Sequence, residues 1–271
     1  MSPMTYHRPT TLGQAKELSQ TLENAVFMSG GHTLLPAMKQ DLATPDHVID
    51  LSHIGELDAI RVDSNDLIIG AMSTHVQVAT STIVQELIPA LAGLAGSIGD
   101  RQVRQRGTIG GSVANNDPAA DYPSAVLGLG GTIITNLREI RADDFFVGLF
   151  ETALEPFEII IAIRFPTPLS AGYAKFKSPA ARYPQAGVFI ARFEGSVRVA
   201  VTGAGQSGVY RLVQLEKTLL ESFVDGAAAN LEISTENLIE DMYATKDYRA
   251  NLVRMMTSHA LKHMGTISIF K

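Results

Sequence analysis

The stretch Gly107–Pro123, G-T-I-G-G-S-V-A-N-N-D-P-A-A-D-Y-P, is the part of this sequence around which the rest is interpreted. Paired glycines among small hydroxyl residues precede two carboxylates, Asp117 and Asp121. Glycine has no Cβ and tolerates positive φ, so the backbone can approach an anionic group closely and offer N–H donors. A carboxylate just beyond such a loop can accept a hydrogen bond from a sugar-type hydroxyl. The stretch predicts part of a site for a phosphate-bearing ligand.

A shorter run of the same kind lies upstream at Ser29–Lys39, S-G-G-H-T-L-L-P-A-M-K. Each loop taken alone is also compatible with a simple strand-to-helix turn, because Gly-Gly is common in turns. Together the loops predict one extended ligand held between them. The patterns G-x-G-x-x-G and G-x-x-x-x-G-K-[ST] are absent from both loops, which argues against the two standard nucleotide-binding folds.

Composition excludes several classes of function. Lys+Arg 22 against Asp+Glu 28 gives a net charge of −6 without a basic block, so nucleic acid and anionic membranes are not expected partners. The chain of 271 residues has no cysteine, which excludes disulfides, thiolate nucleophiles and cysteine-held iron–sulfur clusters within it. No window reaches the roughly 20 apolar residues of a membrane span, and the N-terminus lacks an apolar signal-peptide run. We expect a cytoplasmic protein.

The periodicity of apolar residues predicts a mixed chain with a boundary at Pro166–Pro168. Helices are expected at Leu12–Ala25, Leu34–Gln40, from Val76, at Leu87–Ile98, Leu212–Phe223, Asn230–Met242 and Tyr248–Met264. Strands are expected at Val26–Met28, Val48–Leu51, Leu67–Gly70, Gly131–Thr135, Glu158–Phe165, Tyr173–Lys177, Gly187–Phe193 and Val197–Thr202. The turn Glu194–Ser196 predicts a hairpin.

Two other groups of residues have spacing or charge that could serve a function. His259 and His263 have the i, i+4 spacing of a shared metal site, but Ala260 and Lys262 do not fit a zinc protease motif, so a partly exposed helix face is preferred and no metal site is predicted. The basic residues Arg101, Arg104 and Arg106 precede the main loop. Their pattern is compatible with two interpretations: a solvated helix face, or a role in orienting the loop or contacting a partner subunit. We see no credible nucleophile, and no catalytic residue is predicted.

The two loops resemble a specific pair of motifs, A-G-G-H-S-L-L-P-x-M-K and R-x-x-R-N-x-G-T-I-G-G. Both are found in the FAD-binding medium subunit of the molybdenum hydroxylase family, which includes xanthine dehydrogenase and aerobic carbon monoxide dehydrogenase. Further similarity covers nearly the whole chain, including G-A-M-S-T-H at Gly70–His75, D-F-F at Asp144–Phe146 and D-Y-R at Asp247–Arg249.

This resemblance implies an α+β fold. An FAD-binding domain of the vanillyl-alcohol-oxidase-like type would occupy residues 1–168, with subdomains at about 1–56 and 57–168. A C-terminal flavoprotein domain, built from a three-stranded sheet with helices, would occupy residues 169–271.

The resemblance also implies the cofactor site. The FAD pyrophosphate would lie between the glycine loops, Asp121 would meet a cofactor hydroxyl, and Tyr183 would lie near the isoalloxazine ring. The complete set implied to bind FAD is Ser29, Gly30, Gly31, His32, Thr33, Leu34, Ile98, Thr108, Ile109, Gly110, Gly111, Ser112, Asp121, Ile160, Lys177 and Tyr183.

In the family, substrate is hydroxylated at a molybdenum cofactor on a large subunit, and electrons pass through [2Fe–2S] clusters on a small subunit to FAD. The resemblance thus implies an oxidoreductase subunit with these two partners, in a dimer of heterotrimers. Two alternatives stay open: a self-contained FAD-dependent oxidoreductase of the same superfamily, and a non-catalytic scaffold subunit.

Two segments depart from the family pattern. Pro184-Gln185 follows Tyr183 where small apolar residues are usual, and Gly205–Arg211 lacks the usual proline before its arginine. The substrate of the complex and the terminal electron acceptor are not encoded in any motif of this chain.

Overall fold

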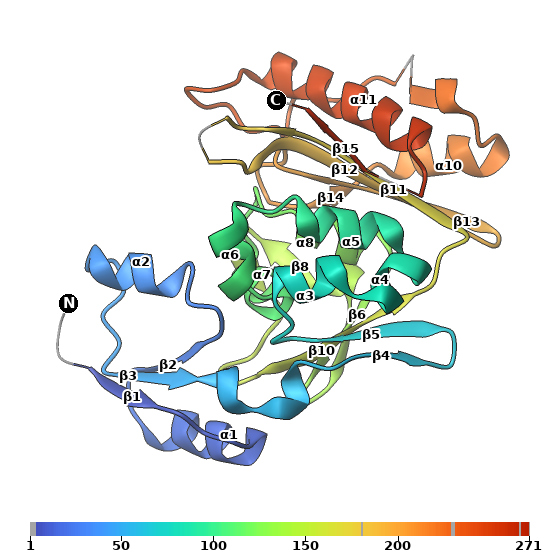
Figure 1. Ribbon diagram of the computed structural model, residues 1–271. Helices are drawn as coiled ribbons and strands as arrows, with labels where there is room; N and C mark the ends of the chain where they lie inside the picture. The colour runs from blue at the N-terminus through green and yellow to red at the C-terminus, as the bar shows by residue number, and fades with distance from the viewer. Residues whose placement is uncertain (1–3, 180, 229–230, 266, 271) are drawn as a thin grey trace.

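A computed structural model describes residues 4–179, 181–228, 231–265 and 267–270 of the chain. Figure 1 shows a small N-terminal unit beside two sheets, with a layer of helices between the sheets and further helices on the outer face of the C-terminal sheet. Helices and sheets are therefore stacked in separate layers, which confirms the predicted α+β class. Within the described residues, every helix is too short or too polar to span a membrane.

The N-terminal unit is a small parallel sheet in the order β1-β3-β2. Its elements are β1 Thr5–His7, α1 Leu12–Thr21, β2 Ala25–Met28, α2 Leu34–Lys39, β3 His47–Asp50 and the 3₁₀ turns Leu51–His53 and Gly55–Leu57. The Thr11 side chain caps α1 by accepting a hydrogen bond from the Gln14 N–H. The upstream glycine loop follows β2 directly and leads into α2, so it lies at the carboxyl end of β2. Helix α2 then connects β2 to the parallel strand β3.

A second sheet has the order β4-β5-β10-β6-β7. Its strands are β4 Ile60–Asp63, β5 Asp66–Gly70, β6 Thr132–Thr135, β7 Glu139–Arg141 and β10 Ile160–Pro166. The central strand β10 is the apolar run expected from the sequence, and its Ile160, Ala162, Ile163 and Phe165 are buried.

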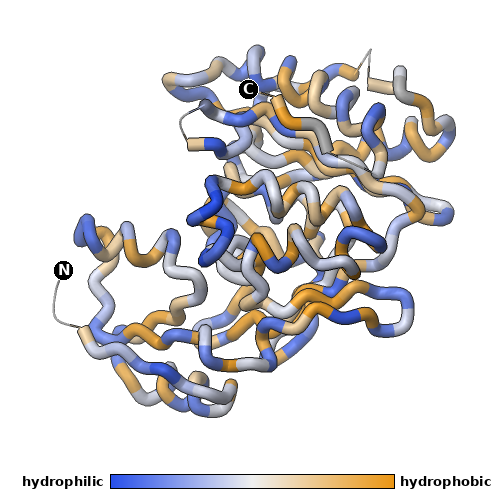
Figure 2. The backbone as a smooth tube through the Cα atoms, viewed as in Figure 1, coloured by the Kyte–Doolittle hydropathy of each residue, from blue (hydrophilic) through white to orange (hydrophobic). Residues whose placement is uncertain are grey.

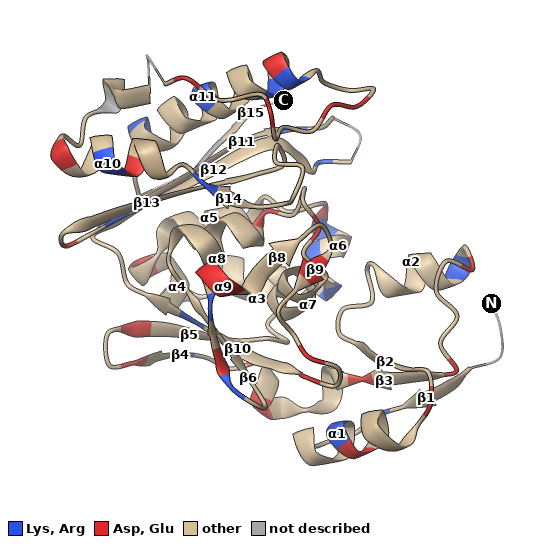
Figure 3. Cartoon of the chain, turned by 180° about the vertical axis from the view of Figure 1, so that it is seen from behind, with Lys and Arg blue, Asp and Glu red and all other residues tan. Residues whose placement is uncertain are grey.

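Helices between the two sheets form the main core. They are α3 His75–Thr80, α4 Thr82–Leu87, α5 Pro89–Gly96, α6 Arg101–Arg106, α7 Ile109–Asn115, α8 Tyr122–Gly128 and α9 Ala142–Phe145. The sequences of α5, α7 and α8 contain no charged residue, and Figure 3 shows them uncoloured. Figure 2 shows α6 as hydrophilic, and none of its residues is buried. A short hairpin of β8 Phe146–Gly148 and β9 Glu151–Thr152 follows α9.

The C-terminal sheet has the order β14-β13-β12-β11-β15. Its strands are β11 Ser170–Lys177, β12 Pro184–Phe193, β13 Ser196–Thr202, β14 Tyr210–Arg211 and β15 Ile267–Phe270, and the helical segments after them are α10 Val213–Glu221, the 3₁₀ turn Asp225–Ala228 and α11 Lys246–Lys262. The long antiparallel strands β11, β12 and β13 are the three expected ones, with two short strands added at the edges. Gly195, with φ of +73°, forms the predicted hairpin turn.

Some sequence predictions were wrong. Of the helix predicted at Asn230–Met242, the described residues 231–242 contain no helix. Their backbone groups bond to the loop after β13 instead: the Ile239 N–H donates to the Ala204 carbonyl, and the Gln206 N–H to the Asn237 carbonyl. Helix α1 ends at Thr21, so Ala25 belongs to β2, and the helix predicted at Leu87–Ile98 starts only at Pro89. Its proline favours the first helical position.

Arg249 of α11 joins the C-terminal helix to the sheet. This buried guanidinium donates to the carbonyls of Gln185 (2.8 Å) and Gly203 (2.7 Å) and pairs with Asp241 at 2.6 Å. We predict that Arg249→Met lowers the free energy of unfolding by about 3 kcal/mol, because it leaves buried carbonyls and a carboxylate unpaired. Chemical denaturation measures this change. Arg254→Met, on the same helix but exposed, should change stability by about 0.5 kcal/mol or less, and equal effects would contradict the prediction.

Candidate functional site

The upstream glycine loop follows strand β2, the downstream loop joins α6 to α7, and the two loops contact each other directly. The Ser29 and Thr108 hydroxyls lie 2.5 Å apart, which joins the end of β2 to the start of α7. Thr108 also caps α7 by accepting the Gly111 N–H at 3.0 Å. The downstream loop is itself attached to the segment after β5, since the Gly110 N–H donates to the Ala71 carbonyl at 2.9 Å.

Glycine is required where the loops meet. A Cβ on Gly30 would overlap the backbone carbonyl of Arg106, and one on Gly110 would lie 2.5 Å from the Cβ of Ala71. Gly31 has φ of +74°, in the left-handed region that other residues rarely adopt. The paired glycines therefore serve loop-to-loop packing as well as access to a ligand.

A cavity of about 660 Å³ lies between these loops. It is lined by residues from the N-terminal unit, from the interlayer helices and from the segment between β11 and β12. The residues that the sequence placed in a site and that line the cavity are Ser29, Gly30, Gly31, His32, Thr33, Leu34, Ile98, Thr108, Gly110, Gly111, Ser112, Asp121, Ile160 and Tyr183. Residues separated by about 150 positions in the sequence thus surround one space.

Ile109 and Lys177 are the two predicted site residues that do not line this cavity. Ile109 is fully buried in the core beneath the loop. Lys177 ends β11, beyond a register shift between Phe176 and Lys177. Lys175, two residues earlier and before that shift, is the lysine that reaches Asp121, with Nζ 2.8 Å from Oδ1. The order of residues does not show which of the two lysines reaches Asp121, and the register of β11 decides it.

Carboxylates gather on one side of the cavity. Asp117 lines it and is half-buried, and burial raises the pKa of this carboxyl. Tyr183 is 48% exposed, and partial burial together with the charges of Asp117 and Asp121 raises the pKa of its hydroxyl. These groups provide hydrogen-bond acceptors and a neutral aromatic ring at one end of the cavity.

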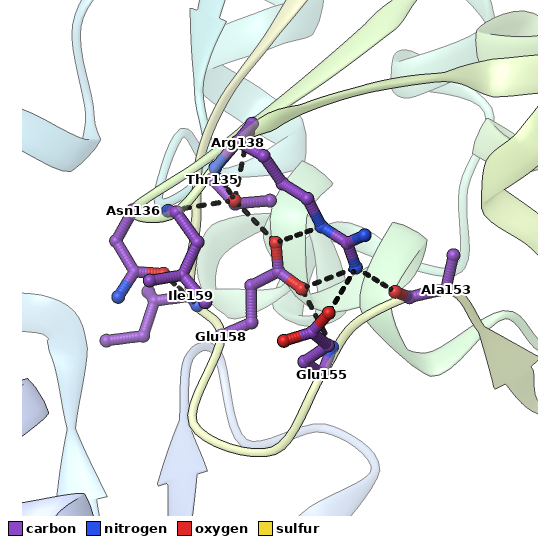
Figure 4. A network of polar contacts seen from close by, with 8 residues as sticks. Thr135, Asn136, Arg138, Ala153, Glu155, Glu158 and Ile159 are labelled. Atoms are coloured by element: carbon purple, nitrogen blue, oxygen red, sulfur yellow. Dashed lines mark hydrogen bonds and ion pairs between the residues drawn. The ribbon is translucent and has the colours of Figure 1, made fainter.

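Glu158 anchors another wall through a network that the sequence did not reveal (Figure 4). Its buried carboxylate accepts hydrogen bonds from the Arg138 guanidinium (3.1 Å to each oxygen), the Thr135 hydroxyl (2.7 Å) and the Glu155 N–H (2.7 Å). Burial opposes ionisation, but these donors hold the pKa of Glu158 below its ordinary value. Asn136 accepts the Ile159 N–H at 2.8 Å and so fixes the start of β10.

The arginines of α6 have different surroundings. Arg104 donates from Nη1 to the carbonyls of Ile98 (2.8 Å) and Gly99 (3.2 Å), so it orients the turn that carries Ile98 into the cavity wall. Arg101 and Arg106 are exposed. Figure 3 shows the basic residues of α6 on the side of the molecule where α2 also lies.

The C-terminal histidine pair lies outside this cavity. The His259 and His263 rings stack with centroids 6.4 Å apart, and the His259 ring lies 4.1 Å from that of Phe270. In the part of the chain that the structure describes, no group of three or more His, Asp or Glu residues is arranged to hold a metal ion. The pair therefore packs within the C-terminal layer.

His75 is a buried imidazole at the cavity wall, only 5% exposed. Its Nδ1 has no hydrogen-bond partner among the described residues, and Nε2 faces Gly107. Burial, followed by the charges of His32 and Arg104, lowers the pKa of His75 to about 3. The side chain is consequently neutral over the physiological range.

Comparisons with known proteins agree with this geometry. Residues 2–168 match a family model described as the FAD binding domain in molybdopterin dehydrogenase. The carbon monoxide dehydrogenase medium chain of Hydrogenophaga pseudoflava is 33% identical over 94% of this chain and 95% of that protein. The nicotine 6-hydroxylase medium subunit of Paenarthrobacter nicotinovorans is 31% identical over 96% of each chain.

Solved structures extend the similarity to the fold of the whole chain. Carbon monoxide dehydrogenase from Hydrogenophaga pseudoflava aligns with a TM-score of 0.84 at 33% identity, covering 96% of both chains. Quinoline 2-oxidoreductase from Pseudomonas putida 86 aligns with a TM-score of 0.85 at 26% identity, covering 96% of both chains.

The fold and the two-loop cavity define a flavin-nucleotide-binding protein. The chain belongs to the family of FAD-binding medium subunits of the molybdenum hydroxylases. It is an FAD-containing oxidoreductase subunit that works with other chains in a multi-subunit complex.

The residues of the cavity fit FAD. The glycine loops provide the close backbone approach that a pyrophosphate needs, and the Thr33 side chain makes no capping hydrogen bond to α2. Asp121 lines the cavity, and its protein donors both bond to Oδ1. Oδ2 is therefore the oxygen available to a cofactor hydroxyl.

The first prediction for this site concerns the loop contact. Gly30→Ala should weaken FAD binding at least about tenfold, because the added methyl group displaces the upstream loop from Arg106. Fluorescence titration of the FAD-depleted protein with FAD measures this. Gly55→Ala is the matched control, since its Cβ would have no atom within 4 Å, and it should bind FAD like the wild type. Unchanged affinity in Gly30→Ala would contradict the role of the contact.

The second prediction concerns pH. Unfolding returns the pKa of His75 to its ordinary value of 6.5, whereas the folded protein holds this pKa at about 3. Between these two pH values the unfolded state therefore binds a proton that the folded state does not bind. Stability should therefore drop with falling pH by about 1.4 kcal/mol per pH unit from this group. His75→Gln should flatten that slope in denaturation curves measured at successive pH values. An identical slope in the variant would show that His75 does not contribute.

Proposed function

We propose that this chain holds FAD in the cavity between the two glycine loops and carries electrons from [2Fe–2S] clusters on a partner subunit to an external acceptor. The observation that supports this most directly is the convergence of Ser29–Leu34 with Thr108, Gly110, Gly111 and Ser112 on one cavity. When bound, FAD supplies the redox chemistry, and the residues of the chain bind it, orient it and shield it from water.

Each part of the cavity wall has a role in this proposal. The backbone N–H groups of Gly30–Leu34 hold the pyrophosphate, and Asp121 accepts a hydrogen bond from a cofactor hydroxyl. The N–H groups of Ile109–Ser112 are already bonded within the protein, so the downstream loop contributes a close backbone approach instead. Ile98, Ile160 and Tyr183 contact the isoalloxazine ring. Ile109 is buried and supports the downstream loop from the core. Lys177, which the family resemblance implied as an FAD-binding residue, does not line the cavity.

Electrons have to arrive from another chain. This chain contains no cysteine and so has no ligands for the thiolate-held clusters of the family. The relatives are named as medium chains or medium subunits, which supports a small iron–sulfur partner and a large molybdenum-cofactor partner. We propose a dimer of such heterotrimers.

We also propose a domain organisation in which the two parts of the chain contribute differently to the cavity. Residues 1–168, with subdomains at about 1–56 and 57–168, carry most of the cavity wall, while residues 169–271 close it from the C-terminal side through Tyr183. The C-terminal sheet packs on α5 and α8 and so supports the helices that carry Asp121 and its loop.

An FAD-free complex tests electron transfer through this chain. We expect one FAD per chain in the purified complex. Gly110→Val should remove FAD, because its side chain collides with Ala71, while size-exclusion chromatography still shows all the subunits together. After reduction of the clusters with limiting dithionite, reoxidation by an added quinone or NAD should slow by at least about tenfold.

Two results would favour the alternatives. Reoxidation at the wild-type rate without FAD would indicate a scaffold subunit whose loops have no redox role. Steady-state substrate turnover by this chain alone would indicate a self-contained flavoenzyme.

A further inference from the structure

A buried ion pair lies directly behind the cavity wall. The Lys175 side chain is fully buried, that of Asp121 is 4% exposed, and Nζ lies 2.8 Å from Oδ1. The Tyr173 hydroxyl donates to the same oxygen at 2.6 Å, and Lys175 also donates to the Ser97 carbonyl at 3.2 Å. Two donors from one strand thus converge on one oxygen of a carboxylate that lines the cavity.

Strand geometry produces this convergence. Alternate residues of a strand share a face, so Tyr173 and Lys175 of β11 point to the same side, toward the start of α8. Asp121 stands at the N-cap of α8, where an aspartate commonly caps its own helix. Here its side chain makes no capping hydrogen bond and is bonded to β11 instead. The C-terminal sheet, rather than the local helix, sets the direction of this carboxylate.

Burial makes the charge of Asp121 dependent on its partner. A carboxylate out of contact with water is costly unless it is paired, and when unpaired it takes up a proton and becomes a hydrogen-bond donor. Lysine supplies the opposite charge, and the tyrosine hydroxyl adds a further hydrogen bond to the ionised form. Both donors bond to Oδ1, so neither of them occupies Oδ2.

We propose that Lys175 and Tyr173 are positioning residues that keep Asp121 ionised, with Oδ2 directed into the cavity, where it accepts a hydrogen bond from a hydroxyl group of FAD. This inference rests on the proposed binding of FAD between the glycine loops. It assigns to Lys175 a role in cofactor binding exerted through Asp121, without direct contact between the lysine and the cavity.

Few other titratable groups face Asp121. Tyr173 on β11 and Tyr122 on α8 are fully buried, and burial together with the charge of Asp121 raises the pKa of both hydroxyls well above the ordinary value, so they stay neutral. Asp117 and Tyr183 lie along the same cavity wall. Lys175 is therefore the only cation bonded to Asp121 among the described residues.

The test measures FAD affinity against pH in Lys175→Met. The complex is depleted of FAD and titrated with FAD at successive values between about pH 6 and about pH 8. We expect the variant to bind at least about tenfold more weakly than wild type at the acidic end, because a neutral carboxyl group accepts a weaker hydrogen bond from the cofactor than a carboxylate does. Its affinity should recover as pH rises and Asp121 ionises, while the difference between wild type and variant shrinks.

Further variants separate this role from general damage to the fold. Lys217→Met removes an exposed lysine of α10 that does not line the cavity, and it should leave the pH dependence of the wild type unchanged. Tyr173→Phe keeps the ring and removes one donor, so it should shift affinity in the same direction by a smaller factor, and it replaces Lys175→Met if that variant does not fold. Adding Asp121→Asn to Lys175→Met should abolish the new pH dependence.

Two outcomes would overturn the inference while FAD binding stands. One is a pH profile of Lys175→Met parallel to that of wild type; the other is a new pH dependence that persists after Asp121→Asn. A wild-type complex that binds no FAD at any pH would overturn the proposed function and, with it, this inference.

Discussion

The close contact between the two glycine loops is the constraint on which the rest of the structure depends. Gly30 lies against the backbone of Arg106 and Gly107, and the Ser29 and Thr108 hydroxyls bond across the same contact. Any Cβ at Gly30 would separate the N-terminal unit from the interlayer helices. The two units approach closely at this point because Gly30 has no side chain to separate it from the backbone of Arg106 and Gly107.

The C-terminal layer supports the other side of the cavity. Thr202 donates from Oγ1 to the Ala120 carbonyl at 2.6 Å, and the Gly203 N–H donates to the Pro118 carbonyl at 2.8 Å. The segment that carries Asp117 and Asp121 is therefore held by β13 as well as by the Lys175 pair on β11. The C-terminal third of the chain therefore fixes the geometry of groups that line the cavity.

Local sequence predicted the elements whose environment is simple. The apolar run of β10 is buried, the hairpin turn at Gly195 has the positive φ that its sequence requires, and the βαβ unit around the upstream loop is parallel. The helix expected at Asn230–Met242 was wrong, because residues 231–242 use their backbone groups to bond the loop at Ala204–Gln206. Such long-range pairing has no signature within the segment itself.

The sequence alone determined the ligand class and the loops, because a backbone that must approach a phosphate closely needs glycine at particular positions, and this need is visible in the residue order. Of the sixteen residues that the family resemblance implied to bind FAD, fourteen line the cavity. Only the tertiary structure decided which lysine pairs with Asp121, how Glu158 and Arg138 brace the opposite wall, and that Ile109 lies in the core. These outcomes depend on strand register and on contacts between distant segments, and residue order does not specify either one locally.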